Sequence, residues 1–126
     1  MAPEPLASVA PFLAPGSATN EDFERLDLRV GRIVAAEPLA RARRPAYKLR
    51  LDFGPAGERQ SSAQLTASYP EPSQLVGRLV VAVVNFPPRR VAGFRSEVLV
   101  LGAVAPSGRV LLLGVDEGAE PGQEVG

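Results

Sequence analysis

Residues 47–53 read YKLRLDF and show the most regular pattern in the chain. Apolar residues occupy the odd positions, and Lys48, Arg50 and Asp52 occupy the even ones. An apolar and charged alternation with a period of two is typical of a β-strand that buries one face. The stretch therefore predicts a half-buried strand with Tyr47 in the core.

Further strands and one helix are predicted on both sides of this stretch. Upstream, apolar residues alternate with Arg29 and Arg32, and Gly31 predicts a bulge or bend. Asn20, followed by acidic residues, predicts the N-cap of a single helical turn. Downstream, ERQSSA (58–63) predicts a strand, and residues 64–77 predict a short helix interrupted by prolines. Three apolar runs predict strands that are buried on both faces (79–86, 97–104 and 109–115).

These elements predict a mainly all-β domain. Short strands with one helix between the third and fourth indicate an OB-fold, a five-stranded Greek-key barrel, here with a short helix and extra C-terminal strands. A β-sandwich is the alternative, and the position of the helix favours the barrel. Residues 1–22, rich in proline and alanine and without periodicity, predict a flexible extension before a domain at 23–126.

The composition restricts the chemistry. The 126 residues include no cysteine and no histidine, which excludes thiol nucleophiles, Ser-His-Asp triads and the usual zinc sites. We therefore expect a protein that is not an enzyme and has neither a metal nor another cofactor. No apolar run approaches the ~20 residues that cross a bilayer, so we expect a soluble, cytoplasmic protein without membrane insertion.

Charge is segregated along the chain although the formal net charge is zero. All 14 basic residues lie between Arg25 and Arg109, together with only six acidic residues, which gives this segment a net charge of +8. A basic body with acidic ends is typical of a protein with a polyanionic partner, and equally of a well-solvated surface.

Three stretches hold the candidate binding residues. RARRPAYK at 41–48 interleaves basic residues with an aromatic ring, an arrangement that can bind along a phosphate backbone. The alternative is a solvated loop. QSSAQ at 60–64 offers hydroxyls, one of which, on Ser62, is predicted to cap the following helix. In NFPPRR at 85–90, two prolines are predicted to project Arg89 and Arg90 beyond the barrel end.

A carboxylate follows at the entrance of the next apolar strand. Glu97 is expected to avoid burial, and it either orients an arginine, accepts from a base amino group or forms an internal salt bridge. No phosphate-cradling glycine motif occurs in the chain, and the carboxylates of residues 116–124 lack calcium-loop spacing.

The chain resembles a known family over residues 23–126. The resemblance is carried by FERLDLRVGRIVAAEPL (23–39), ARRPAYKLRLDFG (42–54), SSAQLT (61–66), VVAVVNFPPRRVAGFRSEVLVLGA (80–103) and VLLLGVDEGAEPGQEVG (110–126). These stretches are similar to the CsaA family of export-related chaperones, which are built from a tRNA-binding domain. They resemble more distantly the C-terminal tRNA-binding module of bacterial methionyl-tRNA synthetases.

The resemblance implies an OB-fold homodimer that binds tRNA by shape and also acts as a chaperone for unfolded or exported polypeptides. A chain too short for a synthetase catalytic domain implies a free-standing protein. A non-catalytic adaptor that uses the barrel only to dimerise is a third possibility. By position, the implied tRNA contacts are Asn85, Arg89, Arg90, Ser96 and Glu97, supported by Arg43, Arg44, Lys48, Ser61 and Ser62.

Overall fold

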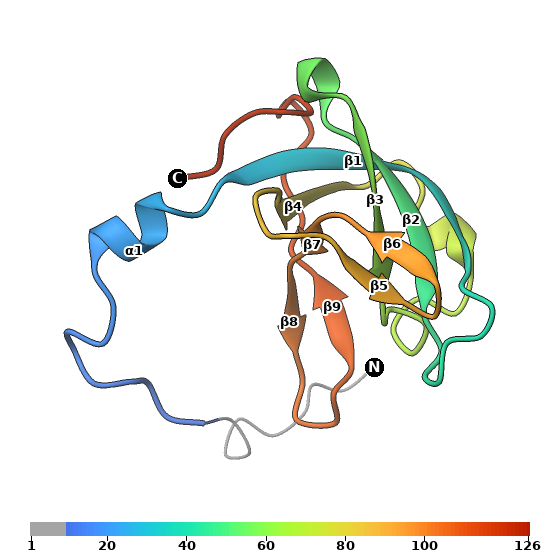
Figure 1. Cartoon of the computed structure of the whole chain (residues 1–126), viewed down its shortest axis with the longest axis horizontal. Coiled ribbons are helices and arrows are strands. Elements are labelled where there is room, and N and C mark those ends of the chain that lie inside the picture. The colour runs from blue at the N-terminus through green and yellow to red at the C-terminus, as the bar shows by residue number, and fades with distance from the viewer. Residues whose placement is uncertain (1–9) are drawn as a thin grey trace.

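The computed structural model describes residues 10–126, in which five antiparallel strands form one sheet that curls into a barrel (Figure 1). The order in the sheet is β3-β2-β1-β4-β7. This arrangement confirms the predicted all-β, OB-like barrel. The elements are α1 (Asn20–Glu24), β1 (Leu28–Pro38), β2 (Tyr47–Asp52), the 3₁₀ turn η2 (Gly54–Ala56), β3 (Glu58–Ala63), the 3₁₀ turn η3 (Pro72–Gln74), β4 (Leu79–Val83), β5 (Arg89–Val91), β6 (Phe94–Ser96), β7 (Leu99–Val100), β8 (Gly102–Val104) and β9 (Val110–Leu112).

Strand β2 lies between β1 and β3 and follows the predicted alternation. Tyr47, Leu49 and Leu51 point into the barrel with 2%, 1% and 0% of their surface exposed. Lys48 lies opposite Glu37 of β1 and Ser62 of β3. The even-numbered residues of β2 therefore line the outer face of the sheet.

The bulge in β1 lies further along the strand than predicted. The register with β2 shifts between Ile33 and Ala35, not at Gly31. Gly31 is needed for a different reason: a Cβ there would lie 2.7 Å from Cε1 of the Phe53 ring. The glycine marks a close side-chain contact rather than the bend itself.

Contacts between β3 and the segment before β7 close the barrel. The Glu97 amide donates to the carbonyl oxygen of Gln60 (2.9 Å), and the Ser61 hydroxyl donates to that of Val98 (2.9 Å). The enclosed space is filled by one apolar cluster. Its fully buried members are Ile33, Leu49, Leu51, Phe53, Leu75, Val80 and Ala82.

The helix predicted between β3 and β4 is wrong. Residues 64–77 form turns and the three-residue 3₁₀ turn η3. Pro70 and Pro72 lack the amide protons that an α-helix needs and also restrict the residues before them. Leu65, Tyr69 and Leu75 are nonetheless buried, so the segment covers the barrel interior without a helix.

Burial on both faces is confirmed for β4 and wrong for the later strands. Every residue of β4 is buried. Leu99 of β7, at the edge of the sheet, remains 43% exposed, and Val104 and Leu111 remain 70% and 46% exposed on the separate hairpin that β8 and β9 form. Within residues 10–126, these three large apolar side chains are therefore left exposed.

The first described residues lead to α1, which lies apart from the barrel (Figure 1). Its N-cap is Thr19, one residue before the predicted cap: the Thr19 hydroxyl accepts from the Asp22 amide, and the Asp22 carboxylate accepts from the Thr19 amide. Of the predicted extension, residues 1–9 are outside the described part, and residues 10–19 are exposed without helix or strand until the cap.

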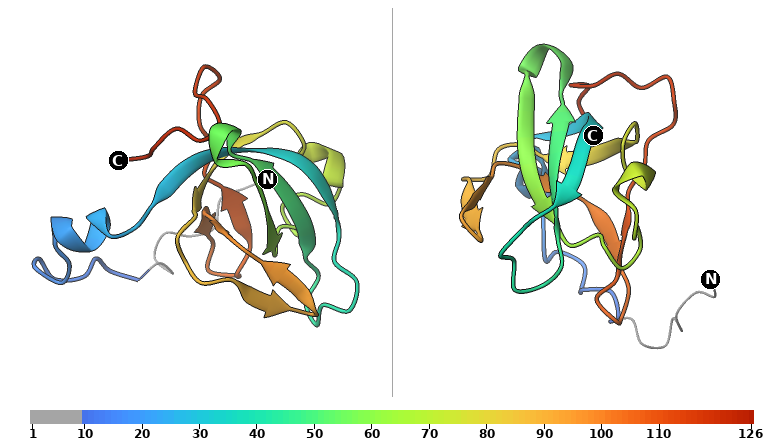
Figure 2. Two further views of the ribbon diagram at one scale, coloured as in Figure 1. Left: turned by 45° about the horizontal axis from the view of Figure 1, so that its top comes forward. Right: turned by 90° about the vertical axis from the view of Figure 1, so that its right-hand side faces the viewer.

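The C-terminal segment and the β5–β6 hairpin lie on opposite sides of the barrel (Figure 2). Backbone hydrogen bonds tie the C-terminal segment to β1, including Val30 N to Gln123 O (2.9 Å) and Val125 N to Leu28 O (2.9 Å). This contact covers a second apolar cluster around Val81 and Val83. The side with the hairpin is left free of the C-terminus.

Candidate nucleic-acid interface

The predicted arginine loop forms a two-stranded ribbon. Strand β5 pairs with β6, so that Arg89 lies opposite Ser96, Arg90 opposite Arg95 and Val91 opposite Phe94. Arg89 and Arg90 therefore lie within a strand, where the prediction had an extended loop, and they point to opposite faces of the ribbon. The preceding prolines lead the chain from β4 into this ribbon.

The ribbon turns through two residues in the left-handed region. Ala92 has φ 51° and Gly93 has φ 80°. Positive φ at both central residues is the mark of the type I′ hairpin turn, whose preferred sequence is Asn-Gly. Glycine adopts this conformation readily, so Gly93 permits the turn, whereas the left-handed Ala92 gives no signal in the sequence.

Replacing Ala92 by asparagine is expected to stabilise the protein by about 0.5–1 kcal/mol, because asparagine tolerates the left-handed region better than alanine. The denaturation midpoint should rise with an unchanged dependence on denaturant concentration. As a control, Gly93→Ala should lower the midpoint because alanine is strained at this positive φ. A Cβ there meets no atom within 4 Å, so backbone strain is the only cause of the expected loss. An unchanged midpoint in both variants would contradict this account of the turn.

One face of the ribbon holds two cations directly opposite each other. Like charges in this position are unfavourable in a sheet unless another charge compensates them. Arg95 has one weak carboxylate neighbour, Glu97, at 3.8 Å, and the two side chains are 57% and 30% exposed. Arg90 donates to the carbonyl oxygen of Gly93 (3.2 Å). This face is thus suited to an anion that bridges Arg90 and Arg95.

The other face of the ribbon meets the loop between β1 and β2. Arg89 lines a groove of about 550 Å³ together with Arg41, Arg43 and Arg44. All four arginines are exposed. The structure therefore brings together the predicted residues Arg43, Arg44 and Arg89, although they lie about 45 residues apart in sequence.

Lys48 and Arg50 extend the basic surface along the outer face of β2. Lys48 contacts Glu37 (3.0 Å) and lies 6.0 Å from the centre of the Phe94 ring. Lys48 and Arg50 line one pocket together with Gln60 and Phe94. An exposed ion pair such as Lys48–Glu37 contributes little to stability, so Lys48 can exchange this partner for a phosphate.

The predicted serines and Glu97 lie at the contact between β3 and β6. The Ser62 amide donates to the Ser96 hydroxyl (3.0 Å), and the Gln60 amide donates to the Glu97 carboxylate (3.0 Å). Ser61 and Ser96 are 0% and 5% exposed. These groups fix the ribbon against the barrel, and Ser62 caps no helix because it lies within β3.

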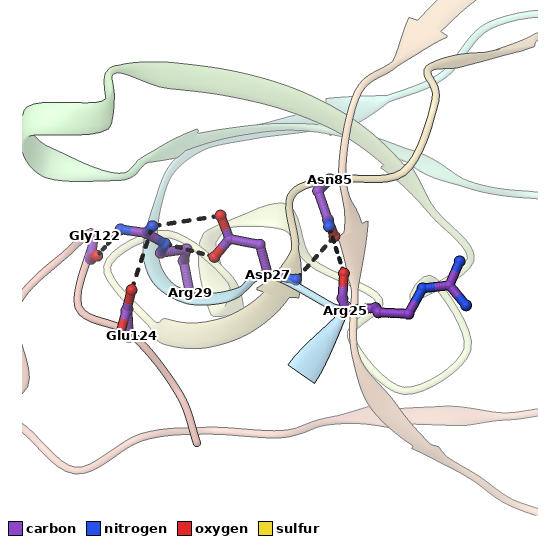
Figure 3. A network of polar contacts seen from close by, with 6 residues as sticks. All are labelled: Arg25, Asp27, Arg29, Asn85, Gly122 and Glu124. Atoms are coloured by element: carbon purple, nitrogen blue, oxygen red, sulfur yellow. Dashed lines mark hydrogen bonds and ion pairs between the residues drawn. The ribbon is translucent and has the colours of Figure 1, made fainter. Parts of the chain in front are cut away.

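Asn85 uses its side-chain amide within the chain (Figure 3). Its Oδ1 accepts from the Asp27 amide (2.9 Å), and its Nδ2 donates to the carbonyl oxygen of Arg25 (2.8 Å). Asp27 in turn accepts from Arg29 (2.7 Å), which also donates to the carbonyl oxygen of Gly122 (3.1 Å). Asn85, at the start of the connection between β4 and β5, is therefore bonded to the segment after α1. Through Asp27 and Arg29, the same network reaches the C-terminal segment.

Two pKa values are displaced by these surroundings. The hydrogen bond and charge of Asp27 raise the pKa of Arg29 above its usual value, with a smaller contribution from Glu124. Burial raises the pKa of Tyr47, whose hydroxyl donates to the carbonyl oxygen of Tyr69 (2.7 Å). Both shifts hold the groups in their ordinary charge state at neutral pH, so neither indicates acid–base chemistry.

Replacing Asn85 by alanine is expected to destabilise the protein by about 1 kcal/mol, because two backbone groups lose their partner. The Asp27 amide should exchange its proton with solvent much faster, while amides of the buried strand β2 change little. Asn85→Asp is the matched control: it keeps the acceptor for Asp27 but not the donor for Arg25. Protection at Asp27 that is lost in both variants, or in neither, would contradict the assigned role.

Sequence reasoning missed three contributors to this surface: Arg50, Phe94 and Arg95. Arg50 was detectable, because the alternation that places Leu49 and Leu51 inside places Arg50 outside. The ribbon pairing that exposes Arg95 opposite Arg90 could not be inferred without the turn at Ala92. Within the described residues no group of acidic side chains is arranged to hold a metal ion. No helix in residues 10–126 has the length and apolarity to cross a membrane.

Comparison with known proteins shows to which family the chain belongs. Residues 28–124 match the family model described as "Putative tRNA binding domain". The chaperone CsaA of Bacillus anthracis is 50% identical, with a TM-score of 0.83 over 88% of this chain and 100% of that one. CsaA of Picrophilus torridus is 44% identical, with a TM-score of 0.78 over 86% of this chain and 99% of that one.

A methionine–tRNA ligase of Neisseria meningitidis is 41% identical over 110 residues, which is 86% of this chain and 16% of the ligase. The chain thus spans about a sixth of the length of the ligases that it matches. By the extent of the family match, the chain belongs to the tRNA-binding domain family.

Proposed function

We propose that the protein is a non-catalytic, cytoplasmic tRNA-binding protein that recognises folded tRNA mainly through its phosphate backbone. One observation carries the proposal: two basic segments far apart in sequence meet at one side of the barrel. They are the β1–β2 loop and the β4–β7 connection, the regions that OB-folds use to bind oligonucleotides. The basic side chains there are Arg41, Arg43, Arg44, Lys48, Arg50, Arg89, Arg90 and Arg95.

The arginines are the proposed phosphate contacts. Guanidinium groups bind phosphates through paired, charge-assisted hydrogen bonds. Arg90 and Arg95 share one face of the ribbon, and an intervening phosphate would relieve their repulsion. Phe94, beside Lys48, offers a ring on which an unstacked base can lie.

The remaining predicted residues are proposed to position these contacts. Ser61 and Ser96 are buried, and the Asn85 amide already has two partners in the chain. Glu97 holds the Gln60 amide. Their loss should therefore reduce binding by loosening the ribbon, whereas loss of an arginine should reduce binding with the fold intact.

We also propose that the protein is a homodimer. Phe23 and Leu26, in and just after α1, are 47% and 37% exposed, and α1 lies away from its own barrel (Figure 1). Apolar side chains on a projecting arm are typical of a segment that packs against another copy. Sedimentation equilibrium should give twice the chain mass, and Phe23→Ser with Leu26→Ser should shift it toward the monomer. A monomer in the unmodified protein would refute the proposal.

The direct test of the RNA-binding proposal is titration of a fluorescent tRNA with the protein at physiological salt. Saturable binding that falls steeply with added salt is expected, because released counterions dominate such affinities. The adaptor alternative predicts no affinity under these conditions, and absence of binding would refute the proposed function.

A polypeptide chaperone is the second candidate function. It is supported by the exposed apolar side chains Leu99, Val104, Leu111 and Leu113 and by the similarity to proteins described as CsaA chaperones. Suppression of aggregation of a denatured enzyme that survives removal of Arg89 and Arg90 would separate this function from RNA binding. Loss of both activities in that variant would assign them to the same surface.

A further inference from the structure

A second, smaller pocket lies beside Arg89. It has a volume of about 260 Å³, and its lining includes Ser62, Phe86, Arg89, Glu97 and Leu99. Arg89 also lines the groove of about 550 Å³ that holds the arginines of the β1–β2 loop. An RNA strand whose phosphates follow that groove would therefore pass beside this pocket.

The size and the apolar side chains of the pocket suit one planar base. Pockets for drug-sized molecules measure roughly 300–1,000 Å³, so this one admits a single ring system rather than a length of folded chain. Phe86 and Leu99 are each 43% exposed, which leaves the Phe86 ring available to an unstacked base. Pro87 follows Phe86 directly and restricts its backbone. The ring is therefore largely positioned before a base arrives.

Of the described residues that line this pocket, only Glu97 is acidic. Gln60 of β3 holds it at both ends: the Glu97 amide donates to the Gln60 carbonyl oxygen (2.9 Å), and Oε1 of Glu97 accepts from the Gln60 amide (3.0 Å). Oε2 of Glu97 lies 3.8 Å from Nε of Arg95, too far for a hydrogen bond, and the side chain is 30% exposed. Oε2 can therefore still accept hydrogen bonds.

A carboxylate at this place repels phosphate and needs a hydrogen-bond donor as its ligand. In RNA the donors are the ribose hydroxyls and the N–H groups of the bases. Among the ion pairs within residues 10–126, Glu97 pairs with Arg95 and not with Arg89. A base can thus bind between Glu97 and Arg89 without breaking an ion pair that joins them.

A carboxylate beside a guanidinium group matches guanine better than the other bases. Guanine presents two neighbouring donors, N1–H and N2–H, next to two acceptors, O6 and N7. Glu97 can accept from these donors, and Arg89 can donate to these acceptors. Adenine and cytosine each offer a single amino group, and uracil offers a single ring N–H. Guanine alone satisfies both side chains with paired hydrogen bonds.

We propose that this pocket binds one unstacked guanine of an RNA strand. The base lies on Phe86, donates through N1–H and N2–H to Glu97, and accepts through O6 and N7 from Arg89. A guanidinium group has enough N–H donors for Arg89 to contact a phosphate as well. The inference rests on the proposed RNA binding and adds base recognition to it. The guanine must be unpaired, because Watson–Crick pairing occupies its N1–H and N2–H.

The pocket is tested with two RNA pentanucleotides, UUGUU and UUIUU, in which I is inosine. Inosine lacks only the 2-amino group of guanosine. With a fluorophore at the 5′ end of each, we expect UUGUU to bind roughly tenfold more tightly, because UUIUU lacks one hydrogen bond to a charged group. Equal affinities, or absence of binding by both, would overturn the guanine pocket whether or not tRNA binds.

Two variants separate base recognition from general affinity. Glu97→Gln keeps an oxygen for the Gln60 amide and replaces Oε2 by a donor, so it should remove the preference for UUGUU with little change in the denaturation midpoint. Phe86→Leu should weaken both pentanucleotides roughly threefold to tenfold and keep the preference, because stacking tolerates any base. A preference that survives Glu97→Gln would overturn the proposal.

Two further titrations distinguish this inference from the proposed functions. Absence of tRNA binding would refute the proposed tRNA-binding function, whereas a preference for UUGUU would still assign the pocket. A reduced, carboxymethylated protein serves as the unfolded polypeptide. If it shifts the methyl resonances of Leu99 in NMR spectra and UUGUU does not, the pocket serves the chaperone candidate, and the guanine proposal is overturned.

Discussion

Replacing Arg89 and Arg90 together by alanine is expected to weaken tRNA binding roughly tenfold to thirtyfold at physiological salt. Each side chain is proposed to make a charge-assisted contact to phosphate, and the loss of two such contacts at about 1 kcal/mol each gives this factor. The slope of log affinity against log salt should fall by roughly one to two units. The measurement is a salt titration of both proteins with the same fluorescent tRNA.

A matched control removes the same charge elsewhere. Arg59 and Arg78 are exposed and line none of the pockets beside the ribbon. Their double replacement by alanine should lower long-range attraction slightly and leave most of the affinity. If the two double variants lose affinity equally, the charge acts only as a general attraction and the ribbon is not the binding site.

The second large effect concerns the C-terminal segment, where Gly122→Ala is expected to destabilise the protein by roughly 2–4 kcal/mol. Gly122 has φ +91°, and a Cβ there would overlap the carbonyl oxygen of Phe53. Strain in the left-handed region and overpacking against backbone each contribute. The Gly122 amide also donates to the carbonyl oxygen of Val30 (2.7 Å), so relaxation of the clash would disturb β1.

Gly108→Ala separates the two causes. Gly108 has φ +90°, and a Cβ there would meet no atom within 4 Å. This variant should lose only about 1 kcal/mol, from strain alone. Both free energies of unfolding are measured by chemical denaturation. Equal losses would show that close approach to Phe53 contributes nothing and would contradict the packing described here.

The barrel could be predicted because its signals are local. Alternation in residues 47–53 fixed the buried face of β2, and the run at 79–83 fixed β4 as buried on both faces, as the structure confirms. The clustering of arginines at 41–44 and 89–90 located two parts of the candidate site. Their proximity followed only from the fold, since loops distant in sequence meet once the barrel is closed.

The features that were missed depend on tertiary contacts or on uncommon backbone conformations. The ribbon turns at Ala92 and Gly93. The glycine indicates a turn, but alanine rarely adopts positive φ, so the two-residue turn that pairs β5 with β6 was not evident. Asn85 bonds to partners that lie 58 and 60 residues away in the sequence. Ser61 bonds to a partner 37 residues away. Part of the segment at 64–77 has a composition that favours a helix, but Pro70 and Pro72 oppose one, and the segment forms turns.

The most direct measurement is competition for the protein among folded tRNA, single-stranded RNA and duplex DNA of equal length, repeated over increasing salt. Our account predicts that folded tRNA displaces the other two, and that its advantage remains where general electrostatic attraction has been screened. It also predicts that removal of Arg89 and Arg90 abolishes most of this advantage. Equal and weak binding of all three nucleic acids would contradict the account, because the basic surface would then attract polyanions without recognising the shape of tRNA.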